Sequence, residues 1–233
     1  ASTPWFMTFD PGIFFKYVLQ NVAGMIGVSV YILADTFFIS LYSGADGLTM
    51  LNLVIPIYGL MYAFGSMVGI GSAIRYALKK ASGDENTDFY FTHALSWDLI
   101  LSIPFILLGI FAPQWVLHLM GADARITELG IQYLRIILIG SPFFMMNYAF
   151  TAFARNDNAT TIAMIGSLSG SAFNIVFDYI FMFPLNMGMA GAAFATALSP
   201  IVTMSVCSIH YLGKKNTIGF RWRLPSPRHL FSC

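Results

Sequence analysis

The sequence predicts an all-α membrane protein with six transmembrane helices. Of its 233 residues, 57% are hydrophobic and only 10% are charged, whereas a soluble domain carries about 25% charged residues. Six long stretches contain no Asp, Glu, Lys or Arg, and an α-helix needs about 20 mostly apolar residues to cross a bilayer. The alternating pattern typical of a membrane β-barrel does not occur. Composition and spacing together exclude an ordinary soluble fold.

The uncharged stretches set the positions of the expected helices. They cover 17–34, 47–74, 99–122, 136–154, 158–177 and 179–213. The last has 35 residues and would be about 52 Å long as one helix, so we expect Pro184 and the glycines after it to separate two helices. We therefore expect one domain over 1–212, with spans near 14–41, 50–76, 90–112, 128–154, 159–183 and 189–212.

Prolines and glycines within the expected spans indicate bends and close helix contacts. A proline inside a helix removes a backbone donor and favours a bend. Pairs of glycines four residues apart allow two helix backbones to approach closely. The prolines are Pro56, Pro104, Pro142 and Pro200, and the glycine pairs are Gly65 with Gly69 and Gly166 with Gly170.

The basic residues predict the orientation in the membrane. If the N-terminus is cytoplasmic, only Arg125 and Arg135 of the 12 Lys and Arg residues fall near the outer side. Lys and Arg accumulate on the cytoplasmic side of membrane proteins, so we expect both termini in the cytoplasm and a multi-pass protein of the plasma membrane. We expect 213–233 to be a basic cytoplasmic linker that contacts lipid headgroups rather than nucleic acid. The other ten are Lys16, Arg75, Lys79, Lys80, Arg155, Lys214, Lys215, Arg221, Arg223 and Arg228.

Three acids lie inside the expected spans, where a charged side chain is costly and usually serves a function. Asp35 follows Lys16 by 19 residues, which places it about 28 Å above the cytoplasmic edge. Asp178 follows Asn158 by 20 residues, about 30 Å by the same rise. The two acids therefore share one level. Asp98 lies in the inner half of its span, where a hydrogen bond to a neighbouring helix is as plausible as a functional role.

Two polar residues are expected beside this acid pair. Asn174 precedes Asp178 by four residues and thus lies on the same helix face. Thr196 lies about two turns into the next span, which descends from the same side. Two carboxylates in a partly dry pocket repel, so one of them should bind a proton readily. The same oxygens also suit a sodium ion, and spacing does not distinguish the two ions. A simple helix-capping role for both acids is the alternative.

Four segments, in this order, resemble the N-terminal six-helix lobe of a MATE (multidrug and toxic compound extrusion) transporter. They are NVAGMIGVSVYILADTFFIS, MVGIGSAIRYALKKASGD, YLRIILIGSPF and NIVFDYIFMFPLNMGMAGAAFATALS. The resemblance implies one lobe of a twelve-helix protein. It also implies that Asp35, Asn174, Asp178 and Thr196 form the cation site of that lobe, with no cofactor beyond a coupling H⁺ or Na⁺.

The resemblance further implies a bacterial or archaeal efflux antiporter that exchanges cationic or aromatic compounds for H⁺ or Na⁺. Such a transporter has two similar lobes, so we expect a chain that is truncated and lacks a C-terminal lobe or second chain as its partner. The alternative is a six-helix assembly or interaction module that does not transport and whose acids only fix helix packing. An enzyme is not expected, because no HExxH, GxSxG or phosphate-binding loop occurs.

Overall fold

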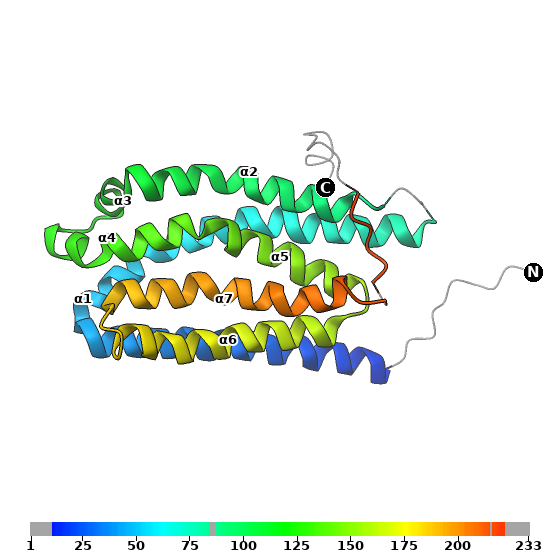
Figure 1. The fold of residues 1–233 in the computed structure, drawn as a ribbon, viewed down its shortest axis with the longest axis horizontal. Helices are drawn as coiled ribbons and strands as arrows, with labels where there is room; N and C mark the ends of the chain where they lie inside the picture. The colour runs from blue at the N-terminus through cyan, green and yellow to red at the C-terminus, as the bar shows by residue number, and fades with distance from the viewer. Residues whose placement is uncertain (1–10, 84–86, 215, 222–233) are drawn as a thin grey trace, which may run out of the picture.

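The computed structural model describes residues 11–83, 87–214 and 216–221. These residues form a helical bundle without a strand, which confirms the predicted all-α class (Figure 1). The helices are α1 (Pro11–Ala81), α2 (Tyr90–Phe111), α3 (Pro113–Leu119), α4 (Ala124–Ile139), α5 (Ser141–Asn156), α6 (Thr160–Met182) and α7 (Gly188–Tyr211).

Helix α1 is a hairpin of two helical arms that meet at Gly44. With 71 residues it would be about 106 Å long if straight, far more than a bilayer requires. Gly44 has φ 59° and ψ −140°, a conformation that only glycine adopts without strain. The chain reverses there (Figure 1). The segment between the first two expected spans, 42–49, is therefore helical except at Gly44.

The remaining crossings follow from helix length. Helices α1, α2, α6 and α7 are long and apolar enough to span a membrane, and the pair α4–α5, bent by 45°, is a fifth candidate. The bend lies at Gly140, and Pro142 stands in the first turn of α5, where a missing backbone N–H costs no helical hydrogen bond. With α1 divided into two arms, the described residues contain six candidate spans, the number that the sequence predicts.

Glycines bring the second arm of α1 against α5. A Cβ added at Gly65 would lie 2.8 Å from Met145 Cα, and one at Gly69 would lie 2.5 Å from the backbone nitrogen of Ala149. Real side chains do not approach so closely, so only glycine permits this contact. The predicted role of the glycine pair in helix packing is confirmed.

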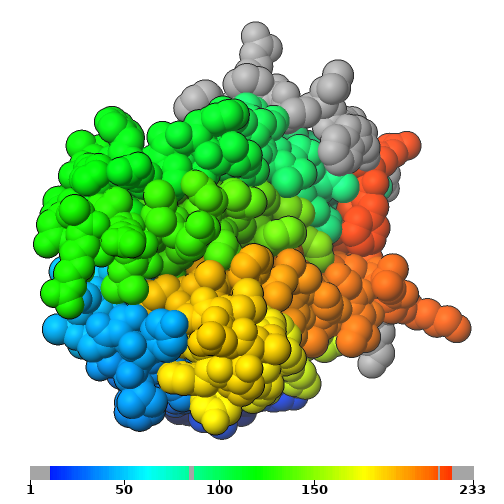
Figure 2. All heavy atoms as spheres, turned by 60° about the vertical axis from the view of Figure 1, so that its left-hand side comes forward, coloured from blue at the N-terminus to red at the C-terminus, as the bar shows by residue number. Residues whose placement is uncertain are grey.

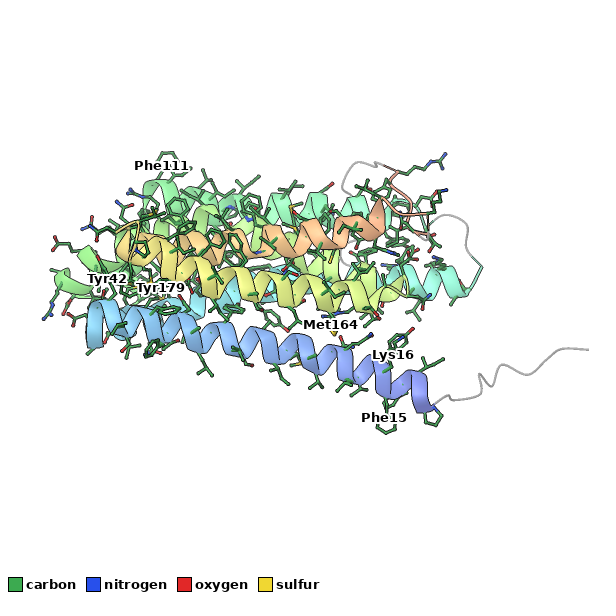
Figure 3. All side chains as sticks on the ribbon, turned by 60° about the horizontal axis from the view of Figure 1, so that its bottom comes forward. Phe15, Lys16, Tyr42, Phe111, Met164 and Tyr179 are labelled. Atoms are coloured by element: carbon green, nitrogen blue, oxygen red, sulfur yellow. The ribbon has the colours of Figure 1, made fainter. Side chains whose placement is uncertain are left out.

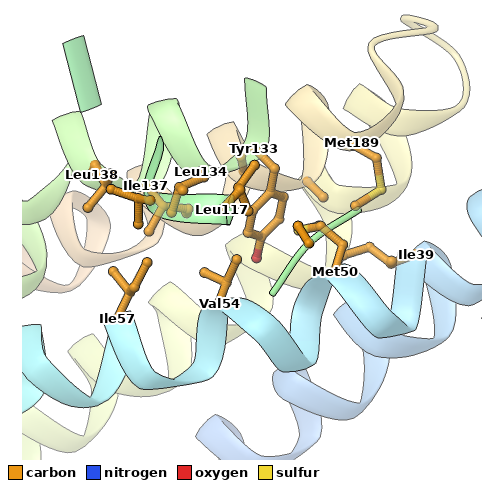
Figure 4. Close-up of a cluster of buried hydrophobic side chains, with 14 of the residues drawn as sticks. Ile39, Met50, Val54, Ile57, Leu117, Tyr133, Leu134, Ile137, Leu138 and Met189 are labelled. Atoms are coloured by element: carbon orange, nitrogen blue, oxygen red, sulfur yellow. The ribbon is translucent and has the colours of Figure 1, made fainter. Parts of the chain in front are cut away.

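The core between α1 and α4 is apolar. Met50, Val54, Ile57 and Met61 recur at helical spacing along the second arm and are buried. Figure 4 shows the first three of them on the side of α1 that faces Tyr133 and the leucines of α4. Ile39 of the first arm joins the same cluster, so this core contacts both arms of α1.

Much of the outer surface is apolar, as expected for a lipid-facing surface. Phe15 and Phe111 are 67% and 79% exposed, and Figure 3 shows both on the outside of the bundle. Figure 2 looks toward the end where α1 reverses, and there the α1 turn, α3 with α4, and the α6–α7 connection lie next to one another. A salt bridge between Arg125 and Asp46 joins the first two of these.

Substituting Gly69 by Ala should destabilise the bundle by about 1–3 kcal/mol, because the added methyl group overpacks the contact with Ala149. Gly59→Ala on the same arm is the matched control, since a Cβ there meets no atom within 4 Å. Thermal unfolding in detergent, followed by tryptophan fluorescence, measures both. Equal melting temperatures for the two variants would contradict the assigned contact.

Candidate functional site

Helices α6 and α7 pack closely in antiparallel register, and this contact positions the site. The Thr203 hydroxyl donates to the Gly166 carbonyl over 3.1 Å, and the Ser199 hydroxyl donates to the Gly170 carbonyl over 2.9 Å. A Cβ at Gly166 would lie 3.1 Å from the Thr203 carbonyl oxygen. One further turn along this register brings Asn174 opposite Thr196.

The Asn174 side chain lies between Asp178 and Thr196. With its nitrogen toward Asp178, the amide donates to Asp178 Oδ2 over 3.1 Å and accepts from the Thr196 hydroxyl over 3.1 Å. The amide oxygen also accepts from the Thr196 backbone N–H over 3.3 Å. In this orientation the amide nitrogen faces an acceptor and the amide oxygen faces donors. The Asn174 side chain therefore bridges Asp178 of α6 and Thr196 of α7.

Asp35 reaches the same place from the first arm of α1. The first arm packs along α6, where a Cβ at Gly27 would contact Leu168 and Ser171. The Asp35 and Asp178 side chains are neighbours, close enough for the charge of one to act on the other. Asp178 and Asn174 are fully buried, and Asp35 and Thr196 are buried as well. The structure thus brings together all four residues that the sequence analysis selects.

Two oxygens of this cluster lack hydrogen-bond partners. Asp35 Oδ1 and Asp178 Oδ1 are buried and accept from no group among the described residues. Unsatisfied buried oxygens are costly, and a proton or a small cation satisfies them. Two carboxylates, an amide oxygen and a hydroxyl form a set of hard oxygen ligands that fits Na⁺ by chemistry. Among the described residues, no group of three or more His, Cys, Asp or Glu side chains could hold a metal.

A cavity of about 1070 Å³ opens beside the cluster. Asp35 and Thr196 form part of its wall, and residues of α1, α4, α5, α6 and α7 line it. This volume lies just above the usual range of about 300–1000 Å³ for small-molecule sites. The acid pair therefore borders a space large enough for an organic ligand.

Tyrosines complete the cavity wall, and sequence reasoning missed them. The Tyr58 and Tyr133 hydroxyls lie 3.1 Å apart and join α1 to α4. Both, together with Tyr31, are near enough to Asp35 and Asp178 to be influenced by their charge. The 11 tyrosines of the chain are spread over many positions, so no pattern in the sequence distinguishes these three.

Asp98 stands apart from the four-residue cluster. It is fully buried in α2, and neither of its carboxyl oxygens has a hydrogen-bond partner among the described residues. It does not belong to the cavity wall. The secondary acid that the sequence singles out is therefore buried in the bundle rather than part of the cluster.

Comparison with known proteins assigns the family. The MatE family model matches residues 22–180. The chain belongs to the MatE family. Multidrug export protein MepA of Staphylococcus saprophyticus is 29% identical over 215 residues, which are 90% of this chain and 48% of that protein.

Solved structures agree with this assignment. One described as the outward-facing conformation of a multidrug resistance MATE family transporter of the MOP superfamily has a TM-score of 0.81 and 29% identity. It is matched over 92% of this chain and 48% of that chain. A crystal structure of MATE in the straight conformation has a TM-score of 0.82 and 28% identity over 93% of this chain and 49% of that one. The chain spans about half the length of these relatives, so this MatE lobe corresponds to one of their halves.

Asn174 and Thr196 should contribute to stability as a coupled pair. Asn174→Ala should cost about 1–3 kcal/mol because it leaves the buried Asp178 with one donor fewer. Thr196→Val should cost less, and the double variant less than the sum of the two. Thermal unfolding of the four proteins of this cycle tests the coupling. Additive losses would show that the two side chains do not act on each other.

Proposed function

We propose that this MatE lobe is the N-terminal half of a multidrug efflux antiporter. In this proposal it exports cationic or aromatic compounds in exchange for H⁺ or Na⁺. The observation that supports it is the buried acid pair, with two unpartnered oxygens, at the wall of a large cavity. The name of the relative in Staphylococcus saprophyticus, multidrug export protein, is consistent with it.

The proposed ion site uses the four residues in distinct roles. Asp35 and Asp178 share the coupling cation, which relieves the repulsion between their charges. Asn174 donates its amide N–H to Asp178 Oδ2 and so orients that carboxyl group. Thr196 supplies a hydroxyl that can accept or donate. Because Asp35 also borders the cavity, a cationic compound and the coupling ion would compete for the same negative charge.

The proposed substrate cavity combines this charge with aromatic walls. Tyr31, Tyr62 and Tyr148 belong to its lining, and the Tyr62 and Tyr148 rings pack edge to face with centroids 5.3 Å apart. Aromatic faces attract organic cations and stack with flat ring systems. Such walls recognise a class of compound by shape and charge rather than one molecule.

Exchange across the membrane would require a second lobe. Transporters of this kind work by rocking one repeat against another around a central site, and this chain matches about half of its relatives. We therefore propose a second MatE lobe as the partner of the cavity face. A six-helix module without transport activity is the competing function, and the next experiment distinguishes the two.

Joining this chain to the C-terminal half of the Staphylococcus saprophyticus relative should produce gradient-driven export of a fluorescent cationic dye. Asp35→Asn or Asp178→Asn should abolish export, because either change removes a charge from the ion site. Asp46→Asn is the matched control, since Asp46 is a partly exposed acid on the same helix and pairs with Arg125. Liposome assays with imposed H⁺ and Na⁺ gradients would identify the coupling ion.

Unchanged export in both site variants would refute the proposed ion site. Export by the unfused chain, lost on Asp35→Asn, would show that one lobe is sufficient and would overturn the need for a partner. If the fusion inserts in the membrane but moves no dye under either gradient, the non-transporting module is favoured.

We further propose that the α1 turn faces outward and that both ends of the lobe's chain face the cytoplasm, following the distribution of basic residues. A cysteine at Ser43, in a background without Cys207 and Cys233, should react with an impermeant thiol reagent in intact cells. A cysteine at Ser82 should react only after permeabilisation. The reverse pattern would invert the topology.

A further inference from the structure

At the opposite end of the bundle from Gly44, the carboxylate of Asp157 is surrounded by donors. Asp157 is the C-cap residue that follows α5, and its side chain is only 2% exposed. His210 Nε2 of α7 lies 2.8 Å from Oδ2, and Lys80 Nζ of α1 lies 3.3 Å from Oδ1. This single carboxylate therefore links three helices.

The same carboxylate also holds the segment that follows α7. We call residues 216–221 the strap. The Thr217 backbone N–H donates to Asp157 Oδ2 over 3.0 Å, and the Thr217 hydroxyl donates to Oδ1. Burial alone would raise the pKa of Asp157, but the hydrogen bonds from Thr217 and His210 and the charge of Lys80 outweigh it and hold that pKa below its usual value. Asp157 is thus ionised at neutral pH and accepts from all of these donors.

Further contacts fasten the strap along its length. The Tyr76 hydroxyl donates to the Thr217 carbonyl over 3.2 Å, and Ile218 is 4% exposed and packs in the core below. At the far end, the Thr92 hydroxyl donates to the Arg221 carbonyl over 2.7 Å, and the Arg221 N–H donates to the Asp88 carbonyl over 3.0 Å. The strap therefore crosses from the end of α7 to the start of α2.

The strap contacts some helices of the lobe and not others. The strap forms hydrogen bonds with Tyr76 of α1, Thr92 of α2 and Tyr211 of α7. It also bonds to Asp157, the residue that follows α5. Within the described residues, no hydrogen bond joins it to α6 or to the first arm of α1. The strap thus ties together one part of the lobe and leaves the part that carries Asp35 and Asp178 outside the tie.

We propose that Asp157 is a clamp that makes the strap a fixed part of the lobe. The described chain then keeps its contacts with the lobe as far as Arg221, beside the start of α2, and not only as far as the end of α7. The consequence for a second lobe rests on the proposed function. A connection to that lobe would begin no earlier than Arg221, ten residues after α7 ends at Tyr211. The clamp itself does not depend on transport.

Hydrogen exchange of the 233-residue chain in lipid nanodiscs, read by mass spectrometry over residues 213–221, tests the clamp. In the unchanged chain the strap amides should exchange slowly, because Thr217 and Arg221 donate to the lobe. Asp157→Asn replaces the acceptor by an amide whose NH₂ group faces donors, and should speed strap exchange roughly tenfold or more. Asp123→Asn is the matched control: Asp123 caps α4 through the Ile126 N–H and has no part in the strap.

Thr217→Pro provides a second variant that leaves Asp157 bound to His210 and Lys80. It removes the Thr217 N–H and hydroxyl donors outside any helix, so it should release the strap while α7 stays protected. Strap exchange as fast in the unchanged chain as in an unstructured peptide would overturn the proposal. So would unchanged strap exchange in either Asp157→Asn or Thr217→Pro. None of these results requires dye transport, so a failure of the proposed function leaves the test intact.

Discussion

The packing of α6 between α7 and the first arm of α1 fixes the position of every residue in the polar cluster. Gly166 and Gly170 allow α7 to approach closely enough for hydroxyls of α7 to reach α6 carbonyls. That register places Asn174 opposite Thr196. On its other side, α6 receives the first arm near Gly27, and the same helix then presents Asp178 to Asp35. A shift of one turn in either contact would separate the four residues.

The buried acids of the lobe differ in whether their carboxyl oxygens have hydrogen-bond partners. Asp157 has both oxygens satisfied by donors from α1, α7 and the strap. Asp35 and Asp178 each have one buried oxygen that no group among the described residues contacts by a hydrogen bond. A fully satisfied network rigidifies a structure, whereas an unsatisfied group retains the capacity to bind. The acid pair differs from Asp98, which is also unsatisfied, because Asp35 borders the cavity.

Much of this fold could be predicted from the sequence, because apolar stretches, glycine pairs and prolines act over short distances. The depth of Asp35 and Asp178 followed from helical rise alone. The Tyr58–Tyr133 pair could not be predicted in this way, because its partners are 75 residues apart and many tyrosines face lipid equally well. The contacts of Asp157 could not be predicted for a similar reason. Thr217 is 60 residues from Asp157 and lies in a segment expected to be a linker. Contacts between distant segments depend on packing that no local pattern encodes.

Gly44 is the one non-helical residue between the two arms of α1. A rigid tilt of the first arm would therefore turn about that residue. Asp35 is nine residues from Gly44, about 14 Å along the helix, and the arm begins at Pro11, about 50 Å away. Any tilt about Gly44 therefore moves the start of the arm between three and four times as far as it moves the carboxylate, so that a small displacement at the acid pair corresponds to a large one at the opposite membrane surface.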